Sequence, residues 1–421
     1  MKIKRIIARA VLDSRGNPTV RADVYLQNGK SAWACAPSGA STGRLEAIEL
    51  RDGGREYGGK GVMRAVKNAN TLIARALEGM DVRGQEKIDA KMCELDGTAN
   101  KAKLGANATT AVSMACLHAG AKAAGKEIYE IMGGSALPVP FMNVINGGKH
   151  AGSSLAVQEF MLAPVGFDDF SSALRAGVEI YHILKTMIKK QYGPSGANVG
   201  DEGGFAPMVA STADALQILE DAIGEAGYGK KVKLASDAAA SEFYDERSGR
   251  YKIDGQELEA GELIEYWDDI TKEYPIIVLE DPFEEGDWHH FAKIRERIGK
   301  RVQIVGDDLT VSSLKLVKKA KKERAINSLL LKVNQVGTVS EAVEAAQYCM
   351  GHKMGVMVSH RSGETEDSTI ADLAVGLNCG QIKTGAPCRG ERTAKYNRLL
   401  EIEARLGEKA RFLGEKALVR Y

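Results

Sequence analysis

Short apolar runs, each followed by a charged residue or a histidine, recur along the chain from residue 231 to the C-terminus. The residues that follow these runs are Asp237, Glu280, Asp307, Lys332, His360 and Lys383, and neighbouring ones are 23 to 43 residues apart. One strand and one helix of a (β/α)8 barrel together take about 30 residues, and the active site lies at the C-terminal ends of the strands. The spacing therefore predicts such a barrel, with the six polar side chains around one mouth.

The N-terminal part of the chain has a different pattern. Strands are expected over residues 3–12, 19–26 and 31–36, and helical periodicity follows over residues 65–77, 84–95 and 106–120. Strands followed by helices are typical of an α+β arrangement. Because Leu137-Pro138-Val139-Pro140 interrupts the pattern, we predict an α+β domain over residues 1–136 and the barrel over residues 137–421.

Composition excludes some classes of partner and location. The chain has 421 residues and a net charge of +1, so no general field attracts nucleic acid or anionic membrane. The basic segment 315–324 is interpreted as the exposed face of a helix. Six scattered cysteines without a CxxC pair are typical of reduced thiols. Without a signal-peptide or membrane-spanning pattern, we expect a cytoplasmic protein.

Three of the strand-end residues, Asp237, Glu280 and Asp307, are carboxylates. Their hard oxygen ligands favour Mg²⁺ or Mn²⁺ over zinc, since the histidines show no HxxxH pairing. Asp281 and Asp308 follow directly, and adjacent strand residues point to opposite sides, so spacing leaves open which member of each pair faces a metal. Each acid alone could instead be a helix N-cap or a salt-bridge partner.

Lys332 and Glu202 are candidates for proton transfer. Lys332 follows three leucines, and like charge nearby would lower its pKa and make the amine a base; a structural ion pair is the alternative. Glu202 lies in the glycine-rich segment 198–207, where glycines let backbone approach a ligand. A carboxyl group there could be a general acid, although such loops are often plain turns.

Three further loops could contact a ligand. Residues 359–363 offer the Arg361 guanidinium, hydroxyl groups and backbone N–H donors, which suit a phosphoryl group. Residues 37–43 are small, as in a lid that closes over substrate. His150 stands in a third loop, also rich in glycine. An ordinary turn, or a structural role for the histidine, is the alternative for each.

Segments along nearly the whole chain are similar to the enolase family. They are residues 13–19, 38–43, 158–161, 200–204, 280–283, 306–310, 330–335, 359–367 and 383–387. The resemblance implies an N-terminal α+β domain followed by a TIM-like (β/α)8 barrel of the enolase type. That barrel begins β-β-α-α, which would explain the irregular pattern over residues 141–230.

The resemblance also implies a reaction, the glycolytic and gluconeogenic interconversion of 2-phosphoglycerate and phosphoenolpyruvate. It makes Lys332 the base at C2 and Glu202 the acid that helps the C3 hydroxyl leave. The implied ligands of two Mg²⁺ ions are Asp237, Glu280 and Asp307 for the first and Ser41 for the second. The implied substrate contacts are His150, Gln158, Glu159, His360, Arg361, Ser362 and Lys383. A homodimer or a higher even homo-oligomer is implied as well.

Two other functions compete with this interpretation. Another enzyme of the same superfamily would abstract a proton beside a carboxylate but would not need Arg361, Ser362 or Glu202. A non-catalytic binding protein on the same fold would not need every catalytic position to hold the required residue type. Arg44, Leu45 and Gly390 depart from the residues that we expect in the family, and none of them is a proposed ligand.

Overall fold

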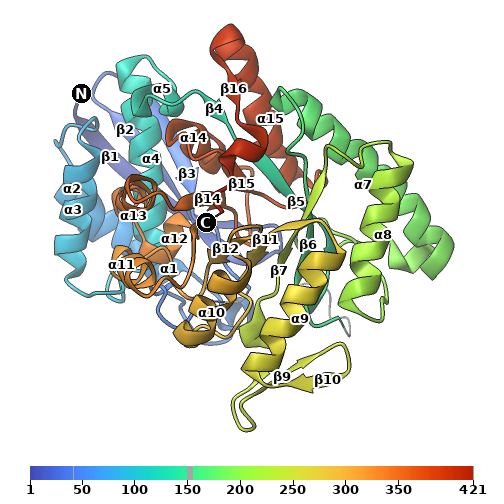
Figure 1. Cartoon of the computed structure of the whole chain (residues 1–421). Helices are drawn as coiled ribbons and strands as arrows, with labels where there is room; N and C mark the ends of the chain where they lie inside the picture. The colour runs from blue at the N-terminus through green and yellow to red at the C-terminus, as the bar shows by residue number, and fades with distance from the viewer. Residues whose placement is uncertain (41, 149–154, 421) are drawn as a thin grey trace.

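The N-terminal region is built on a three-stranded antiparallel sheet. The structure, a computed structural model, describes residues 1–40, 42–148 and 155–420, so Ser41 and His150 lie outside the described residues (Figure 1). The sheet has the order β1 (Ile3–Leu12), β2 (Pro18–Leu26) and β3 (Ser31–Cys35). The three predicted strands are thus confirmed to within one residue.

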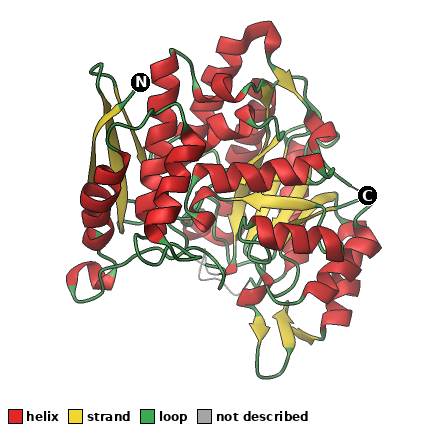
Figure 2. Ribbon diagram, turned by 90° about the vertical axis from the view of Figure 1, so that its left-hand side faces the viewer, coloured by secondary structure: helices red, strands yellow, loops and turns green. Residues whose placement is uncertain are grey.

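Helices cover one face of this sheet and separate it from the barrel. The predicted helix over residues 65–77 is present as α1 (Met63–Asn68), a π-helical turn η2 (Ala69–Ile73) and α2 (Ala74–Leu77), and the others are α3 (Gln85–Asp96), α4 (Ala106–Ala124) and α5 (Ile128–Met132). The alanine-rich helix α4 is buried along most of its length because it packs on β2 and β3 and also contacts barrel helices. Figure 2 shows the sheet at one edge of the molecule, with helices between it and the barrel.

The C-terminal region is a closed eight-stranded barrel. Its strands are β5 (Val139–Asn146), β6 (Glu159–Ala163), β7 (Lys233–Asp237), β11 (Ile276–Glu280), β12 (Gln303–Gly306), β13 (Ser328–Leu331), β14 (Gly355–Ser359) and β15 (Gln381–Lys383). Only β6 runs antiparallel to its barrel neighbours. Since helices α7 (Phe170–Gly196) and α8 (Thr212–Glu225) follow β6, the expected β-β-α-α start is confirmed.

The later helices alternate with the strands as predicted. They are α9 (Ala260–Glu273), α10 (Trp288–Ile298), α11 (Leu314–Glu323), α12 (Val333–Val336), α13 (Val339–Gly351), α14 (Thr369–Gly376) and α15 (Gly390–Leu406). Asp287 and Thr338 are the N-caps of α10 and α13. The side chain of each accepts a hydrogen bond from the backbone N–H three residues later, of His290 and Glu341 respectively. A small sheet, β8 (Tyr244–Asp245), β9 (Arg250–Ile253) and β10 (Gln256–Leu258), precedes α9, and β4 (Ala136–Leu137) pairs with β16 (Arg411–Phe412).

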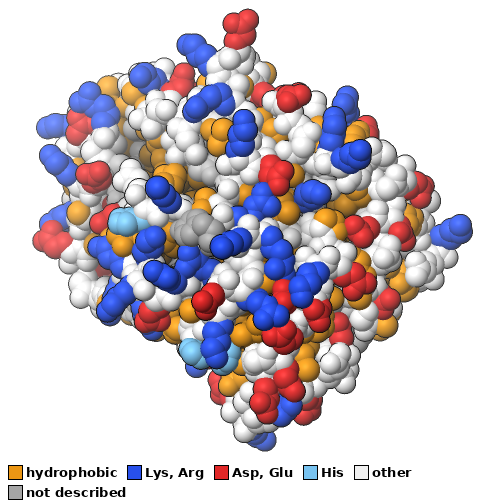
Figure 3. Space-filling model, in the orientation of Figure 1, with side chains coloured by type: hydrophobic (Ala, Val, Ile, Leu, Met, Phe, Trp, Pro, Cys, Tyr) orange, Lys and Arg blue, Asp and Glu red, His pale blue; other side chains and the backbone are white. Residues whose placement is uncertain are grey.

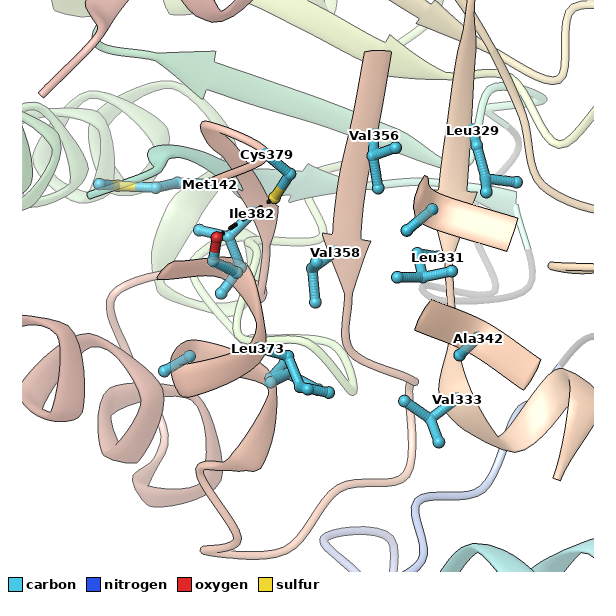
Figure 4. Packing of buried hydrophobic residues seen from close by; sticks show 14 of the residues in the cluster. Met142, Leu329, Leu331, Val333, Ala342, Val356, Val358, Leu373, Cys379 and Ile382 are labelled. Atoms are coloured by element: carbon cyan, nitrogen blue, oxygen red, sulfur yellow. Dashed lines mark hydrogen bonds between the residues drawn. The ribbon is translucent and has the colours of Figure 1, made fainter. Parts of the chain in front are cut away.

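The barrel strands bury both of their faces, in two separate layers. Leu330 and Met357 belong to the cluster that fills the barrel interior. Their neighbours Leu329, Leu331 and Val358 belong to the larger cluster that includes residues of the surrounding helices (Figure 4). This two-sided burial is why the strands read as continuous apolar runs in the sequence.

The C-terminal tail closes one end of the barrel. Ala417 belongs to the interior cluster, and its carbonyl oxygen accepts a hydrogen bond from Nε2 of Gln381 at 2.8 Å. The N–H of Val419 donates to Oε1 of Gln303 at 3.0 Å. Both glutamines are fully buried at the first residue of a strand. The polar residues that end the strands therefore lie at the opposite mouth.

The surface and the thiols agree with the sequence analysis. Lys315, Lys318, Lys319 and Lys322 are exposed on α11, and Figure 3 shows basic side chains over this part of the molecule, so the basic segment is the outer face of a helix. All six cysteines are free. Within the part of the chain that the structure describes, no helix is both long and apolar enough to cross a bilayer.

Candidate active site

One cavity at the C-terminal mouth of the barrel collects ten of the residues predicted from the sequence. It is lined by Ala40, Gln158, Glu159, Glu202, Asp237, Asp307, Lys332, Ser359, His360, Arg361, Ser362 and Lys383. Glu280 joins the group through a contact with Lys383. The predicted residues Ser41 and His150 lie outside the described residues.

Lys383 lies among three buried carboxylates. Its Nζ is 3.0 Å from Oδ2 of Asp237, 3.0 Å from Oε1 of Glu280 and 3.1 Å from Oε2 of Glu159. Strand register produces this cluster, since Glu159 pairs with Asp237 across β6 and β7, and Asp237 pairs with Glu280 across β7 and β11. Residues paired in this way lie side by side at the same level of the barrel.

Burial shapes the pKa values of this cluster. Burial raises the pKa of Glu280 well above its usual value, and the charge of Asp237 acts in the same direction. Burial and the neighbouring Glu202 do the same to the pKa of Glu159. Burial alone would lower the pKa of Lys383, but the surrounding carboxylates outweigh it and raise that pKa. The site thus holds more carboxylates than one ammonium neutralises.

This donor set fits a hard divalent cation. Asp237, Glu280 and Asp307 all offer carboxylate oxygens, the ligands that Mg²⁺ prefers. Oε1 of Gln158 is buried and finds no hydrogen-bond donor among the described residues, which leaves one more oxygen for a ligand at the cavity. The residues present therefore agree with the metal that the sequence analysis expected.

Asp281 and Asp308 have different surroundings from their neighbours. The carboxylate of Asp281 accepts the backbone N–H groups of Asp307 at 2.9 Å and Asp308 at 2.8 Å. Burial and then Asp307 raise the pKa of Asp308 to about 8. Asp281, Asp307 and Asp308 each have one carboxylate oxygen within 4.8 Å of the others. Glu280 ends β11 and reaches Lys383, whereas Asp281 follows the strand with φ of +39° and accepts backbone donors, so the two adjacent acids have different partners.

Lys332 is paired with Asp307. It follows the last residue of β13, and its Nζ contacts Oδ2 of Asp307. Burial, the largest single influence, would lower the pKa of Lys332, but the neighbouring carboxylates Asp307 and Glu280 together outweigh it, so the pKa is raised. The lowered pKa was expected for a lysine beside a bound metal, and this arrangement of side chains alone does not test that prediction. The ion pair weighed as an alternative for Lys332 is formed.

Glu202 projects from a glycine-rich loop into the cavity. Its Oε2 accepts a hydrogen bond from Nδ2 of Asn143 at 3.0 Å and lies 3.3 Å from Nε2 of His360. The loop needs its glycines: Gly203 has φ of +85°, and a Cβ on Gly204 would lie 2.0 Å from the side-chain oxygen of Asn146. The side chain of Glu202 is only 3% exposed.

The N-terminal region contributes the opposite wall of the site. Glu46 pairs with Arg361 through two contacts, 2.8 Å to one guanidinium nitrogen and 3.2 Å to the other. Arg15 donates to Oγ of Ser362 at 3.3 Å. Backbone hydrogen bonds of 2.8 Å in both directions join Ser38 to Gly363. Residues 37–40 and the barrel loop that contains Arg361 thus meet directly at the cavity.

Sequence analysis assigned no role to Asn143, Glu46 or Arg392, which touch the predicted residues. Asn143 is a fully buried polar residue within the apolar strand β5, and such an interruption is a signal that could have been used. Glu46 and Arg392 carry no comparable signal, because a charged residue in a loop or on a helix usually faces solvent.

Comparison with known proteins shows the same family along the whole chain. The family model described as "Enolase, N-terminal domain" matches residues 3–132, and "Enolase, C-terminal TIM barrel domain" matches residues 134–420. A protein named Enolase from Methanopyrus kandleri is 56% identical over 416 residues, which cover 98% of this chain and 97% of the relative. The enolase of Pyrococcus furiosus is 53% identical over 420 residues, covering 99% and 97%. That of Methanocaldococcus jannaschii is 53% identical over 409 residues, covering 96% of each chain.

Proposed function

This chain belongs to the enolase family, whose enzymes are lyases, and we propose that it catalyses the reversible, Mg²⁺-dependent dehydration of 2-phosphoglycerate to phosphoenolpyruvate. The observation that supports this most is the convergence of Lys332, Glu202 and Arg361 on one cavity beside a cluster of carboxylates. A base, an acid, a phosphoryl-binding cation and a metal site are the four parts that this reaction needs.

Abstraction of the C2 proton is the difficult step. That proton is weakly acidic, because its removal adds a second negative charge to the substrate carboxylate, so catalysis must stabilise charge that grows in the transition state. Two Mg²⁺ ions, held by Asp237, Glu280 and Asp307 and by Ser41, would supply positive charge at that carboxylate. Lys383, whose pKa is raised, adds a permanent cation to the same region.

Lys332 is the proposed base. In the present arrangement Asp307 raises its pKa and so holds the proton on the amine. A metal held by Asp307 would offset the charge of that carboxylate and would favour the neutral amine of Lys332 that acts as base at C2. The same carboxylate would thereby couple the filling of the metal site to the basicity of Lys332.

Glu202 is the proposed acid that protonates the departing C3 hydroxyl. Arg361 and Ser362 are proposed to hold the phosphoryl group, since a guanidinium and a hydroxyl are strong donors to such an anion. His150, Gln158, Glu159 and His360 are proposed as the remaining substrate contacts.

The first experiment follows phosphoenolpyruvate formation from 2-phosphoglycerate by ultraviolet absorbance, with Mg²⁺ titrated in and a chelator added. Metal-dependent product that disappears with chelator is the expected result. Folded protein that gives no product with Mg²⁺ present would refute the proposal and favour another superfamily reaction, which screening of other 2-substituted carboxylates would test.

Two variants separate the roles of base and acid. Lys332→Ala should abolish solvent exchange of the C2 proton, and persistent exchange would remove Lys332 as the base. Glu202→Gln should retain that exchange and block dehydration, because the glutamine amide cannot deliver a proton. Loss of both activities in Glu202→Gln would contradict the division of labour.

We also propose a cytoplasmic enzyme that assembles as a homodimer or a higher even homo-oligomer, on the family resemblance. The domain boundary is proposed to lie at residues 136 and 137. Limited proteolysis and light scattering of the purified protein test the boundary and the assembly, respectively.

A further inference from the structure

Arg392 is a fully buried cation on α15 to which the proposed mechanism gives no role. Its guanidinium donates to Nδ1 of His360 at 2.6 Å, to the carbonyl oxygen of Arg361 at 2.6 Å, to that of Asp201 at 3.0 Å and to that of Ser362. Oε1 of Glu391 lies 3.4 Å from its Nε. The two terminal nitrogens of Arg392 therefore donate to one imidazole nitrogen and to three carbonyl oxygens. All four acceptors belong to the two loops that carry Glu202 and Arg361.

The contact with His360 determines where the proton of the imidazole lies. A guanidinium has only donors and stays protonated in proteins, so the ring nitrogen that faces it must accept through a lone pair. Nδ1 of His360 is that nitrogen. The single proton of the neutral ring is then on Nε2, on the side of the ring that faces Glu202.

The surroundings also keep the ring neutral. Burial lowers the pKa of His360 to about 3; Glu202 opposes this shift, and Arg392 and Lys383 support it. A second proton would have to sit on Nδ1, directly against the guanidinium of Arg392.

One hydrogen bond and one close N–H group then meet at the same oxygen of Glu202. Nδ2 of Asn143 donates to Oε2 at 3.0 Å, and Nε2 of His360 lies 3.3 Å from the same atom. An oxygen that accepts the N–H of Asn143 and faces the Nε2–H of His360 at 3.3 Å is the poorer place for a carboxyl proton, because a hydroxyl there would displace an acceptor lone pair. The proton of the acid form therefore belongs on Oε1.

We propose that Arg392 is a positioning residue that fixes the Nε2–H tautomer of His360, so that His360 and Asn143 hold Oε2 of Glu202 as an acceptor and proton delivery falls to Oε1. The tautomer is a property of the folded chain alone. The consequence for proton delivery rests on the proposed function, in which Glu202 is the acid.

The test is a long-range ¹H–¹⁵N correlation spectrum of protein labelled with ¹⁵N-histidine, recorded between pH 5 and 8, with His360→Gln used to assign the signal. In the wild-type protein His360 should show a pyridine-type Nδ1 and a protonated Nε2 over the whole range. In Arg392→Met the ring should populate the Nδ1–H tautomer, because the donor that requires a lone pair on Nδ1 is gone. Arg392→Lys, which keeps a charged donor, should restore the Nε2–H tautomer.

Lys395→Met is the matched control. Lys395 is a buried cation one turn further along α15, and it donates to Glu364 and to carbonyl oxygens of Thr365 and Glu391. Its replacement should lower stability without changing the His360 spectrum.

Two spectroscopic results would overturn the proposal. One is a wild-type ring protonated at Nδ1, which is measurable even if Arg392→Met does not fold. The other is a spectrum of folded Arg392→Met that matches the wild type at every pH.

An activity measurement adds the catalytic consequence. Arg392→Met should lower kcat for dehydration by about 100-fold, the lower end of what a positioned general acid contributes, while exchange of the C2 proton continues. Equal loss of both would assign Arg392 a general structural role and contradict the positioning proposal. If the wild-type protein makes no phosphoenolpyruvate, the proposed function fails, and the tautomer is still decided by the spectra.

Discussion

Replacement of His360 by glutamine should make the folded protein less sensitive to mild acid. The wild-type imidazole is 2% exposed, and burial lowers its pKa to about 3, whereas a histidine in an unfolded chain has a pKa of about 6.5. As the pH falls, the unfolded chain binds a proton at this residue before the folded chain does. The stability that His360 contributes is therefore present above about pH 6.5 and is lost as the pH falls toward about 3.

The size of the effect follows from these two pKa values. At pH 5 the unfolded histidine is about 1.5 pH units below its pKa, and each unit corresponds to about 1.36 kcal/mol. The wild-type protein should thus lose about 2 kcal/mol of unfolding free energy between pH 7.5 and pH 5 through this residue alone. His360→Gln lacks this loss, and its unfolding at pH 5 should take up about one proton fewer.

Urea denaturation of both proteins at pH 7.5 and pH 5 measures the difference. The buried carboxylates with raised pKa values act in the opposite direction, but they are common to both chains. Val358→Ala, a buried change on the same strand β14 without a titratable group, should lower stability equally at both pH values. If His360→Gln shows the same pH dependence as the wild type, His360 is not held neutral, and the reasoning about Arg392 fails with it.

Three other perturbations have defined outcomes. Gly134→Ala should lower the unfolding free energy by about 3 kcal/mol in urea denaturation, because the new Cβ would lie 1.9 Å from a backbone oxygen of α14. Gly224→Ala on α8 is the contrasting variant: no atom lies within 4 Å of the new Cβ, so it should raise the unfolding free energy by about 0.5–1 kcal/mol. Glu46→Gln should lower stability by about 3–5 kcal/mol, since it removes the carboxylate that pairs with the buried guanidinium of Arg361. Inorganic phosphate should restore part of the lost Tm, and a Tm shift with phosphate equal to that of the wild type would contradict this pairing. Lys383→Met should make Mg²⁺ raise the Tm more than in the wild type, because ammonium and metal neutralise the same carboxylates; equal shifts would refute that competition.

The barrel was predictable from the sequence because its signals are local. Each strand buries both faces and so appears as an apolar run, and the polar residue after it marks the C-terminal mouth. Asp237, Glu280 and Lys383 could thus be assigned to one site before any contact was known. The choice between Glu280 and Asp281 was not local, since it depends on which side of β11 faces the barrel axis and on the backbone donors that Asp281 accepts.

What the sequence did not reveal depends on contacts between distant segments. The sequence marked Lys332 as a candidate base but did not identify Asp307, 25 residues earlier, as the partner that raises its pKa in this structure. Glu46 pairs with Arg361 across 315 residues of sequence. No periodicity or spacing records such pairs, because they follow from how the N-terminal region packs on the barrel mouth.

The closure of the barrel by its own C-terminal tail has a consequence for how the chain matures during synthesis. Strand β15 pairs with β5, the first barrel strand, and Arg392 reaches back 191 residues to Asp201. A nascent chain that still lacks its last segment has neither a closed cylinder nor an oriented Glu202. Closure of the barrel and orientation of Glu202 therefore both require the segment up to Arg392, and contacts of such long range favour slow folding.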